Sequence, residues 1–551
     1  MPATVLDISF CLRARFFAVR FAHSMYGTID IFVGMLLAVA GLALIARRLH
    51  IPYPILFVIG GLLLGLIPGI PRVHLNPELI FLFCLPPLLY PAALFTSWRD
   101  FRANLRPIGL LAVGLVLITT VAIAWLAHHF MNLPWAAGFV LGAIISPPDA
   151  IAATAIAERL RVPRRIVTVL EGESLVNDAT ALVAYRFAIM AVATGSFSLG
   201  HASVQFFVVC IGGILVGLAV GWLAEWFHKR VQDPPIEITV SLLTPFTAYL
   251  TADRLEVSGV LAVVTTGLYL GWRLPEITDF KTRLDARPVW DMVEFVLNGF
   301  VFILIGLQLP TVRQAAGGHE LPKSELIFYA LLISLAVIVV RILWVFPATY
   351  LPRLIFKKLR ERDPYPSWRH VVILAWTGMR GVVSLAAAMA LPETKEDGTP
   401  FPGRDLILFL SFVIILATLV VQGLSLPPLI RWLGVEDDDS LEREERKARL
   451  AANKAALARL SQIAEHDAAK SDALKRVRIE YEDRISQLEV SQSDHHKNHR
   501  LRLFSQEYER LSREGLKQER ETILQLRNKD VINDEVLRRI QQDIDLAEAR
   551  L

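Results

Sequence analysis

The feature that most constrains this chain is a series of apolar blocks, each close to the length that a helix needs to cross a lipid bilayer. A crossing helix takes about 20 consecutive apolar residues. Apolar residues make up 54% of the 551 residues, and the mean hydropathy is +0.45 although a polar C-terminal segment lowers it. These values are typical of a polytopic membrane protein rather than a soluble one.

Thirteen blocks are expected to span the membrane as helices, which makes the fold class all-α and polytopic. The blocks cover residues 29–46, 53–70, 79–97, 107–127, 134–157, 166–194, 203–227, 236–252, 257–271, 289–309, 325–351, 370–391 and 406–432. The even-numbered connections between them carry few basic residues, namely Arg72, Arg254, Arg313, Lys323, Lys395 and Arg404. The odd-numbered connections carry 21 basic residues. Positive charge resists translocation, so we expect the odd connections and the C-terminus on the cytoplasmic side and the N-terminus outside.

Composition divides the chain into three parts: residues 1–28, 29–432 and 433–551. The first part is an N-terminal extension that does not resemble a clean signal peptide, because Arg13, Arg15 and Arg20 interrupt its apolar residues. We therefore expect translation to begin at Met25. The second part is the predicted transmembrane domain.

The third part, residues 433–551, changes abruptly to a charged composition. Apolar residues recur there at helical spacing, for example Val536, Ile540 and Ile544. This pattern predicts a water-soluble helical tail in the cytoplasm, a hairpin or a coiled-coil-like bundle. A solvated appendage that aids assembly is favoured over a ligand sensor.

The block at 166–194 contains "LEGESLVNDATALV", in which polar residues stand where hydrocarbon is expected. Glu173 and Asn177 are four residues apart and share one helix face, and Ser174 and Asp178 share the adjacent face. An ionised residue at the centre of a span costs roughly 2.5–3.5 kcal/mol on insertion scales, a cost seldom kept without use. The patch must therefore face protein or a water-filled cavity rather than lipid.

Two other blocks are expected to break in mid-membrane. In "ISPPDAIAATA", Pro147 and Pro148 precede Asp149 and remove the amide donors that a continuous helix needs. In "AWTGMRGVVSLAAA", glycines stand close to Arg380 on both sides and permit unwinding. The arginine would supply the countercharge to the acids.

The two breaks fall in the fifth and twelfth blocks, an odd offset that makes the two helices run in opposite directions. Paired broken helices in antiparallel orientation indicate an inverted-repeat transporter with its site at the crossing. There the N-termini of the half-helices meet with positive dipole ends and the C-termini with negative ends. Asp149 can neutralise the first and Arg380 the second.

Five segments in this order resemble the monovalent cation–proton antiporters, in the bacterial sodium/proton exchanger branch that carries an Asn-Asp motif. They are "SPPDAIAATA", "GESLVNDATALV", "LEVSGVLAVVTTGLYLG", "FVLNGFVFILIGLQL" and "WTGMRGVVSLAAA". The resemblance covers about residues 29–432, and the tail is similar to that of bacterial members. It implies a homodimer in which a six-helix core moves against a dimerisation domain.

The resemblance also implies roles for individual residues. Asp178 matches the carboxylate that binds either the cation or the proton, so it is the transient metal ligand. Asn177 matches the asparagine associated with electroneutral exchange, and Ser174 a residue near the cation. Asp149 matches the aspartate of the unwound helix. Glu173 matches an acid that forms an ion pair with the arginine matched by Arg380.

Two positions depart from the family pattern. The family often has threonine where Pro148 stands, so the Pro148 carbonyl or Ser146 is left to take the place of that hydroxyl. Archaeal relatives carry a glutamate in the third span that helps to coordinate the cation, and Pro91 stands there. The selectivity of the site between Na⁺ and K⁺ is therefore left open.

The predicted function is secondary antiport of a monovalent cation, Na⁺ or else K⁺ or Li⁺, for H⁺. One carboxylate holds either ion but not both, and a bare charge is costly to move through low dielectric, so only loaded forms cross. A single negative charge predicts one-for-one, electroneutral exchange for pH and cation homeostasis. A cation channel, a K⁺-selective antiporter and a signalling protein with vestigial transport are the alternatives.

The expected surroundings follow from this function. We expect multi-pass insertion in a bacterial plasma membrane, contact with lipid, a homodimer, and no nucleic acid or cofactor. Neither Gly-x-Gly-Asp nor His-Glu-x-x-His occurs, which argues against an intramembrane protease. Cys11, Cys84 and Cys210 form no disulfide or metal pattern.

Overall fold

The structure is a computed structural model that describes the chain in several ranges. These are residues 32–49, 51–67, 80–195, 199–231, 233–317, 322–395, 397–435, 440–466, 472–490, 495–529, 531 and 534–549. The predicted N-terminal extension and the predicted start at Met25 lie outside these ranges. The chain forms two compact units, Met1–Asp437 and Asp438–Leu551, and each is described by itself.

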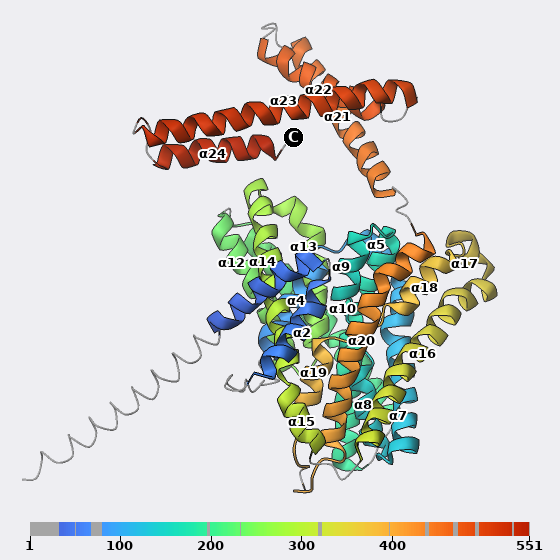
Figure 1. Cartoon of the computed structure of the whole chain (residues 1–551). Coiled ribbons are helices and arrows are strands. Elements are labelled where there is room, and N and C mark those ends of the chain that lie inside the picture. Colours follow the sequence, from blue (N-terminus) through green and yellow to red (C-terminus); the bar gives the residue numbers. More distant parts are fainter. Residues whose placement is uncertain are drawn as a thin grey trace, which may run out of the picture. The chain divides into compact units, whose positions relative to one another are not determined.

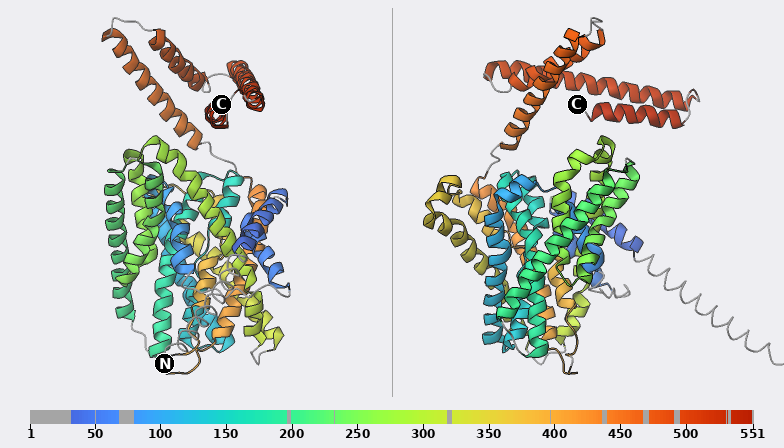
Figure 2. Two further views of the ribbon diagram at one scale, coloured as in Figure 1. Left: turned by 90° about the vertical axis from the view of Figure 1, so that its left-hand side faces the viewer. Right: turned by 180° about the vertical axis from the view of Figure 1, so that it is seen from behind.

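The first unit is a bundle of helices (Figures 1 and 2). Its helices are Phe32–Leu49, α2 (Tyr53–Gly65), η1 (Ile80–Cys84), α4 (Leu85–Leu94), α5 (Trp98–Ala103), α6 (Leu105–Gly109), η2 (Leu110–Leu115), α7 (Val116–Met131), α8 (Trp135–Ile145), α9 (Ile151–Arg159), α10 (Arg164–Thr194), α11 (Leu199–His228), α12 (Pro234–Arg254), α13 (Gly259–Ile277), α14 (Phe280–Leu307), α15 (Leu309–Gly317), α16 (Lys323–Ile355), α17 (Lys357–Arg362), α18 (Trp368–Trp376), α19 (Val382–Met389) and α20 (Arg404–Leu433). The predicted all-α fold class is confirmed in the described part of the chain.

In the described ranges, each predicted apolar block lies largely in helix. Within the described ranges, seven helical segments are long and apolar enough to cross a membrane. They are Phe32–Leu49, Leu105–Met131, Arg164–Thr194, Ala202–His228, Phe280–Gln314, Lys323–Ile355 and Arg404–Leu433. The remaining blocks form shorter or interrupted helices, so the number of thirteen crossings stays a prediction.

Two of the interrupted helices are those expected to break. The fifth block is divided into α8 and α9, with non-helical residues 146–150 between them, and the twelfth into α18 and α19, with residues 377–381 between them. In Figure 1, α9 and α18 lie in the upper half of the bundle and α8 and α19 in the lower half. The two broken helices therefore run in opposite directions, as predicted.

Small residues let α7 and α8 approach closely and so fix the first half of one broken helix. A Cβ atom at Gly142 would lie 2.4 Å from the carbonyl oxygen of Thr120, and one at Gly138 would lie 2.9 Å from that of Ala124. Membrane helices that pack without a hydrophobic driving force use such close backbone contacts. The packing holds α8 against the continuous helix α7.

Asp363, between α17 and α18, joins three elements at one end of the bundle. Its carboxylate accepts hydrogen bonds from Arg106 on α6 at 3.0 Å, Arg165 on α10 at 2.8 Å and Arg353 on α16 at 2.7 Å. Burial acts to raise the pKa of Asp363, but the three guanidinium groups outweigh it and hold that pKa below its usual value. This cluster anchors the first turn of the helix α10.

The second unit consists of helices α21 (Ser440–His466), α22 (Asp472–Val490), α23 (His495–Asn528) and α24 (Asp534–Glu548). α23 and α24 lie side by side as a hairpin (Figures 1 and 2). Ile523, Leu537 and Ile544 form its buried core, and Arg520 pairs with Asp545 at 2.6 Å. Within this unit, α23 and α24 thus form a helical hairpin with a small apolar core.

Candidate functional site

Asp149 begins the second half of the first broken helix. Its Oδ1 accepts a hydrogen bond from the amide of Ile151 at 2.9 Å, which satisfies one of the free donors at the start of α9. An acid at a helix N-terminus also offsets the positive end of the helix dipole. The prolines before it cannot donate amide hydrogens, so the chain leaves the helix after Ile145 and re-enters it only at Ile151.

The two breaks contact each other directly. The amide of Asp149 donates a hydrogen bond to the carbonyl of Met379 at 2.7 Å. A Cβ atom at Gly381 would lie 1.9 Å from Oδ2 of Asp149, so only glycine fits there without displacing that carboxylate. Asp149 thus lies between the start of α9 and the start of α19.

Arg380 lies at the C-terminal ends of the half-helices α8 and α18, whereas Asp149 lies at the N-terminal ends of α9 and α19. Its guanidinium donates to the carbonyl of Ser146, just beyond the C-terminus of α8, and its amide donates to Oγ1 of Thr418 on α20 at 3.1 Å. The side chain is fully buried. A cation at a helix C-terminus interacts favourably with the negative end of the dipole, which is the placement that the dipole argument requires.

Helix α10 brings its polar patch against the first break. The Asn177 side-chain amide donates to the carbonyl of Pro148 at 2.6 Å, and Ser174 Oγ accepts from the amide of Ala150 at 3.4 Å. Asn177 is fully buried, and its Oδ1 has no hydrogen-bond partner among the described residues. An acceptor oxygen is therefore left unsatisfied beside the break.

Asp178 lies next to Asn177 and is 8% exposed. It has no ion-pair or hydrogen-bond partner in the described part of the chain, whereas Asp149 is a charged neighbour of the same sign. Asp149 and Ser174 are partly exposed. The site thus contains a carboxylate without a fixed partner, and two of the residues around it are partly exposed on the surface of the described structure.

Glu173 does not pair as the family resemblance implied. Its carboxylate forms a two-pronged ion pair with Arg341 on α16, with Oε2 at 2.8 Å from Nη2, and both side chains are almost completely buried. No ion pair with Arg380 is formed in the described structure. The physical reason is geometric: Arg341 reaches Glu173 from the facing helix, whereas the Arg380 side chain is drawn to the C-terminus of α8.

Arg341 and Thr418 are the site residues that the sequence reasoning missed. Arg341 carried a usable signal, because it is a charged residue in the middle of the apolar block 325–351. The same rule that singled out Glu173 applies to it. Thr418 carried no such signal, since a lone threonine in an apolar helix usually bonds to its own backbone, as Thr418 also does to Ile414.

The donor set restricts what the site can hold. Around the break it offers the oxygens of Asp178, Asn177, Asp149, Ser174 and the Pro148 carbonyl. Among the residues that the structure describes, no group of three or more His, Cys, Asp or Glu side chains could hold a metal ion. Carboxylate and carbonyl oxygens suit hard cations, and carbonyl oxygens can replace the hydration shell of an alkali ion.

The chain is similar to several known proteins. A family model described as "Sodium/hydrogen exchanger, transmembrane" matches residues 34–432. A Na⁺/H⁺ exchanger of Mycobacterium tuberculosis, described as uncharacterised, is 37% identical over 525 residues, which is 95% of this chain and 96% of that protein. A sodium, potassium, lithium and rubidium/H⁺ antiporter of Bacillus subtilis is 36% identical over 414 residues, 73% of this chain and 61% of that protein.

Among solved structures, the fold is similar to that of the sodium proton antiporter MjNhaP1 from Methanocaldococcus jannaschii. The match covers 74% of this chain and 98% of that chain, with a TM-score of 0.59. The sequences are 21% identical over it, so this likeness shows the fold alone.

Proposed function

The chain belongs to the sodium/hydrogen exchanger family, and from this premise we propose that it exchanges a monovalent cation for a proton at Asp178, one for one. The observation that carries the proposal is the state of this carboxylate. It is buried in the bundle, has no fixed partner among the described residues, and directly follows Asn177, whose Oδ1 is unsatisfied. A hydrated or partly dehydrated cation would give Asp178 a countercharge and give the Asn177 oxygen a partner.

Competition at one carboxylate is enough to produce exchange. Asp178 holds either H⁺ or a cation, and either form is neutral. The empty form carries a bare charge, whose transfer through low dielectric is costly. Because only loaded forms cross, movement of a cation in one direction is tied to movement of a proton in the other.

The charges around the site support an electroneutral cycle. Glu173 and Arg341 neutralise each other, and Arg380 donates to the carbonyl of Ser146 at the C-terminal end of α8. The charge that changes partner is then the single charge of Asp178. A cycle that moved net charge would respond to voltage by about 2.3 kcal/mol per charge per 100 mV, and this site has no second carboxylate at position 177.

We propose Na⁺ as the main cation, with K⁺ and Li⁺ as further substrates. The relative in Bacillus subtilis, described as acting on sodium, potassium, lithium and rubidium, supports a broad range. The buried helix α4 carries Pro91 at the position where the family resemblance implies a coordinating glutamate in archaeal relatives. A site with one carboxylate fewer discriminates less between ions of equal charge.

We further propose that the protein lies in a bacterial plasma membrane as a homodimer, with its N-terminus outside and its tail in the cytoplasm. The concentration of basic residues in alternate connections supports the orientation. The family model supports multi-pass insertion and transport rather than enzymatic catalysis.

The decisive experiment measures counter-ion flux after reconstitution of Asp178→Asn in proteoliposomes. We expect the variant to insert and fold but to exchange neither Na⁺, Li⁺ nor K⁺ for H⁺. Asp253→Asn is the matched control. Asp253 lies at the exposed end of α12, and its ion pair with Arg186 is long, at 3.8 Å, so the variant should retain full activity. Exchange by Asp178→Asn, or wild-type cation flux without a counter-ion as in a channel, would contradict the proposal.

A second measurement tests the stoichiometry. When the membrane potential of wild-type proteoliposomes is clamped at different values, the exchange rate should stay constant, because the loaded site is neutral in both directions. A clear rise or fall of the rate with voltage would show that more charges take part.

A further inference from the structure

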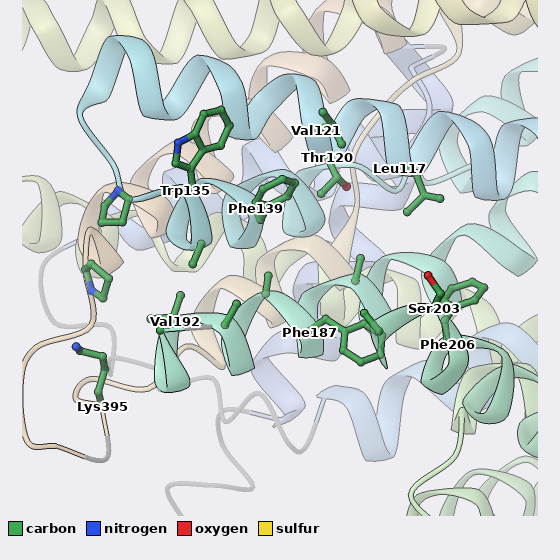
Figure 3. Close-up of a pocket in the computed structure, with 18 of the residues that line it drawn as sticks. Leu117, Thr120, Val121, Trp135, Phe139, Phe187, Val192, Ser203, Phe206 and Lys395 are labelled. Carbon is green, nitrogen blue, oxygen red and sulfur yellow. The ribbon is translucent and has the colours of Figure 1, made fainter. Parts of the chain in front are cut away.

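An apolar cavity of about 1120 Å³ lies away from the carboxylate site, between the helices α7, α8, α10 and α11. Figure 3 shows Trp135 and Phe139 on one wall, Phe187 and Val192 on the opposite wall, and Lys395 at one end. Its volume exceeds the roughly 300–1,000 Å³ of pockets that hold drug-sized ligands. The cavity is therefore large enough for a long hydrocarbon chain.

The chemistry of the cavity changes toward one end. Its walls are mostly aliphatic and aromatic, whereas Trp135 stands at the first turn of α8 and Lys395 lies in the loop between α19 and α20. Tryptophan and snorkelling lysine side chains are typical of the level of lipid headgroups. The cavity thus has an apolar interior that suits an acyl chain and a polar mouth that suits a lipid headgroup.

The mouth carries charges of both signs in a defined order. Lys395 lines the cavity, and its Nζ lies 3.3 Å from Oδ2 of Asp397, which does not line it. Hydrogen bonds from the Thr399 side chain and backbone hold the pKa of Asp397 at about 2, so this exposed carboxylate is ionised at neutral pH. An ammonium has three donor hydrogens, so Lys395 can bind a second anion while it faces Asp397.

We propose that this cavity binds one phosphatidylethanolamine molecule, with an acyl chain between α8 and α10, its phosphate at Lys395 and its ammonium at Asp397. From the cavity outward, the protein presents the positive Lys395 and then the negative Asp397, and the lipid presents its negative phosphate and then its positive ammonium. In this lipid the phosphate is nearer to the chains, and the primary ammonium, a hydrogen-bond donor, lies beyond it. An anionic lipid would satisfy Lys395 but would meet the charge of Asp397.

The first experiment maps the site with the full chain reconstituted in vesicles that contain phosphatidylethanolamine with a diazirine in one acyl chain. Illumination and mass spectrometry should place the label mainly on the cavity residues Phe139, Phe187 and Val192. The exposed face of α16 near Leu331 and Leu343 serves as the bulk-lipid reference. Equal labelling of the cavity and of α16 would overturn the proposal.

A filling substitution tests whether the label depends on the cavity. Ala191→Phe on α10 and Ala202→Phe on α11 project into it from two walls, and each should reduce cavity labelling severalfold. Ala40→Phe, at an exposed position on the helix Phe32–Leu49, is the matched control and should leave labelling unchanged. Unchanged labelling in both cavity variants would remove the cavity as the binding site.

The headgroup is tested by competition with unlabelled lipids of the same chains. Phosphatidylethanolamine should compete better than phosphatidylcholine, whose ammonium cannot donate a hydrogen bond, and better than phosphatidylglycerol or a free fatty acid. Lys395→Gln should weaken phospholipid binding about twofold to fivefold, the effect of one exposed ion pair, and Asp397→Asn should abolish the preference over phosphatidylcholine. Lys323→Gln at the start of α16 is the control. Equal competition by all four lipids, or no effect of Lys395→Gln, would contradict the assignment.

Discussion

At the scale of single residues, the site depends on how buried charges are paired. Glu173 and Arg341 are both almost completely buried and bind each other through two hydrogen bonds. Such a pair adds little net stability compared with apolar residues of similar volume, but removal of one partner leaves an uncompensated charge. Within the pair, neither charge is left uncompensated in the bundle.

We therefore predict that Arg341→Met lowers the stability of the protein by about 3–5 kcal/mol, because Glu173 is left buried and unpaired. The double variant Glu173→Gln, Arg341→Met should recover most of this loss. Thermal unfolding in detergent measures both effects, and a double-mutant cycle gives the coupling.

Arg186→Gln is the control for this cycle, since Arg186 is half exposed and its contact with Asp253 is 3.8 Å long. Its effect should stay within about 0.5 kcal/mol. If the double variant were no more stable than Arg341→Met alone, the two side chains would not act as a pair.

At the scale of elements, the crossing of the two broken helices sets the geometry of the site. Gly381 has extended backbone angles, φ −126° and ψ −156°, that any residue can adopt. What requires glycine there is space, because a Cβ atom would overlap the Asp149 carboxylate. Asp149 can therefore approach the start of α19 this closely only because Gly381 carries a hydrogen atom in place of a Cβ atom.

We predict that Gly381→Ala reduces exchange at least tenfold, a cost of about 1.4 kcal/mol or more, because the added methyl group displaces Asp149 from the start of α9. Gly41→Ala is the matched control, since nothing lies within 4 Å of a Cβ atom there. Flux in proteoliposomes measures both. A fully active Gly381→Ala variant would show that the position of Asp149 is not critical.

The sequence predicted these breaks because proline and glycine act on their own local backbone. It predicted the polar patch on α10 because helical spacing alone places Glu173, Asn177 and Asp178 close together. It could not select the partner of Glu173, since that choice depends on how α16 packs against α10. The hydrogen bond from Arg380 to Thr418 was missed for the same reason: it joins residues 38 positions apart.

At the scale of the whole molecule, the two units differ in how they are stabilised. The membrane unit has extensive apolar cores, whereas the hairpin of the tail relies on a small cluster around Ile523, Leu537 and Ile544. Below a certain size such a core contributes little stability. The tail should therefore be sensitive to the loss of single side chains, without consequence for the membrane unit.

We predict that Leu537→Ala lowers the stability of the hairpin by about 2 kcal/mol, because it leaves a cavity in a core with few other members. Limited proteolysis of the full chain should then cleave α23 and α24 faster, while exchange in proteoliposomes stays at the wild-type rate. Leu546→Ala, at an exposed position on the same helix, is the control. Loss of exchange in Leu537→Ala would mean that transport depends on an intact tail.

The backbone hydrogen bond from Asp149 to Met379 fixes the lengths of both interruptions. Insertion or deletion of one residue in either segment would rotate the half-helix beyond it by about 100° and shift it by about 1.5 Å along its axis. Every side chain on α9 or α19 would then face a different neighbour. Length changes among homologous chains should consequently accumulate in the connections at the membrane surface and never in these two short segments.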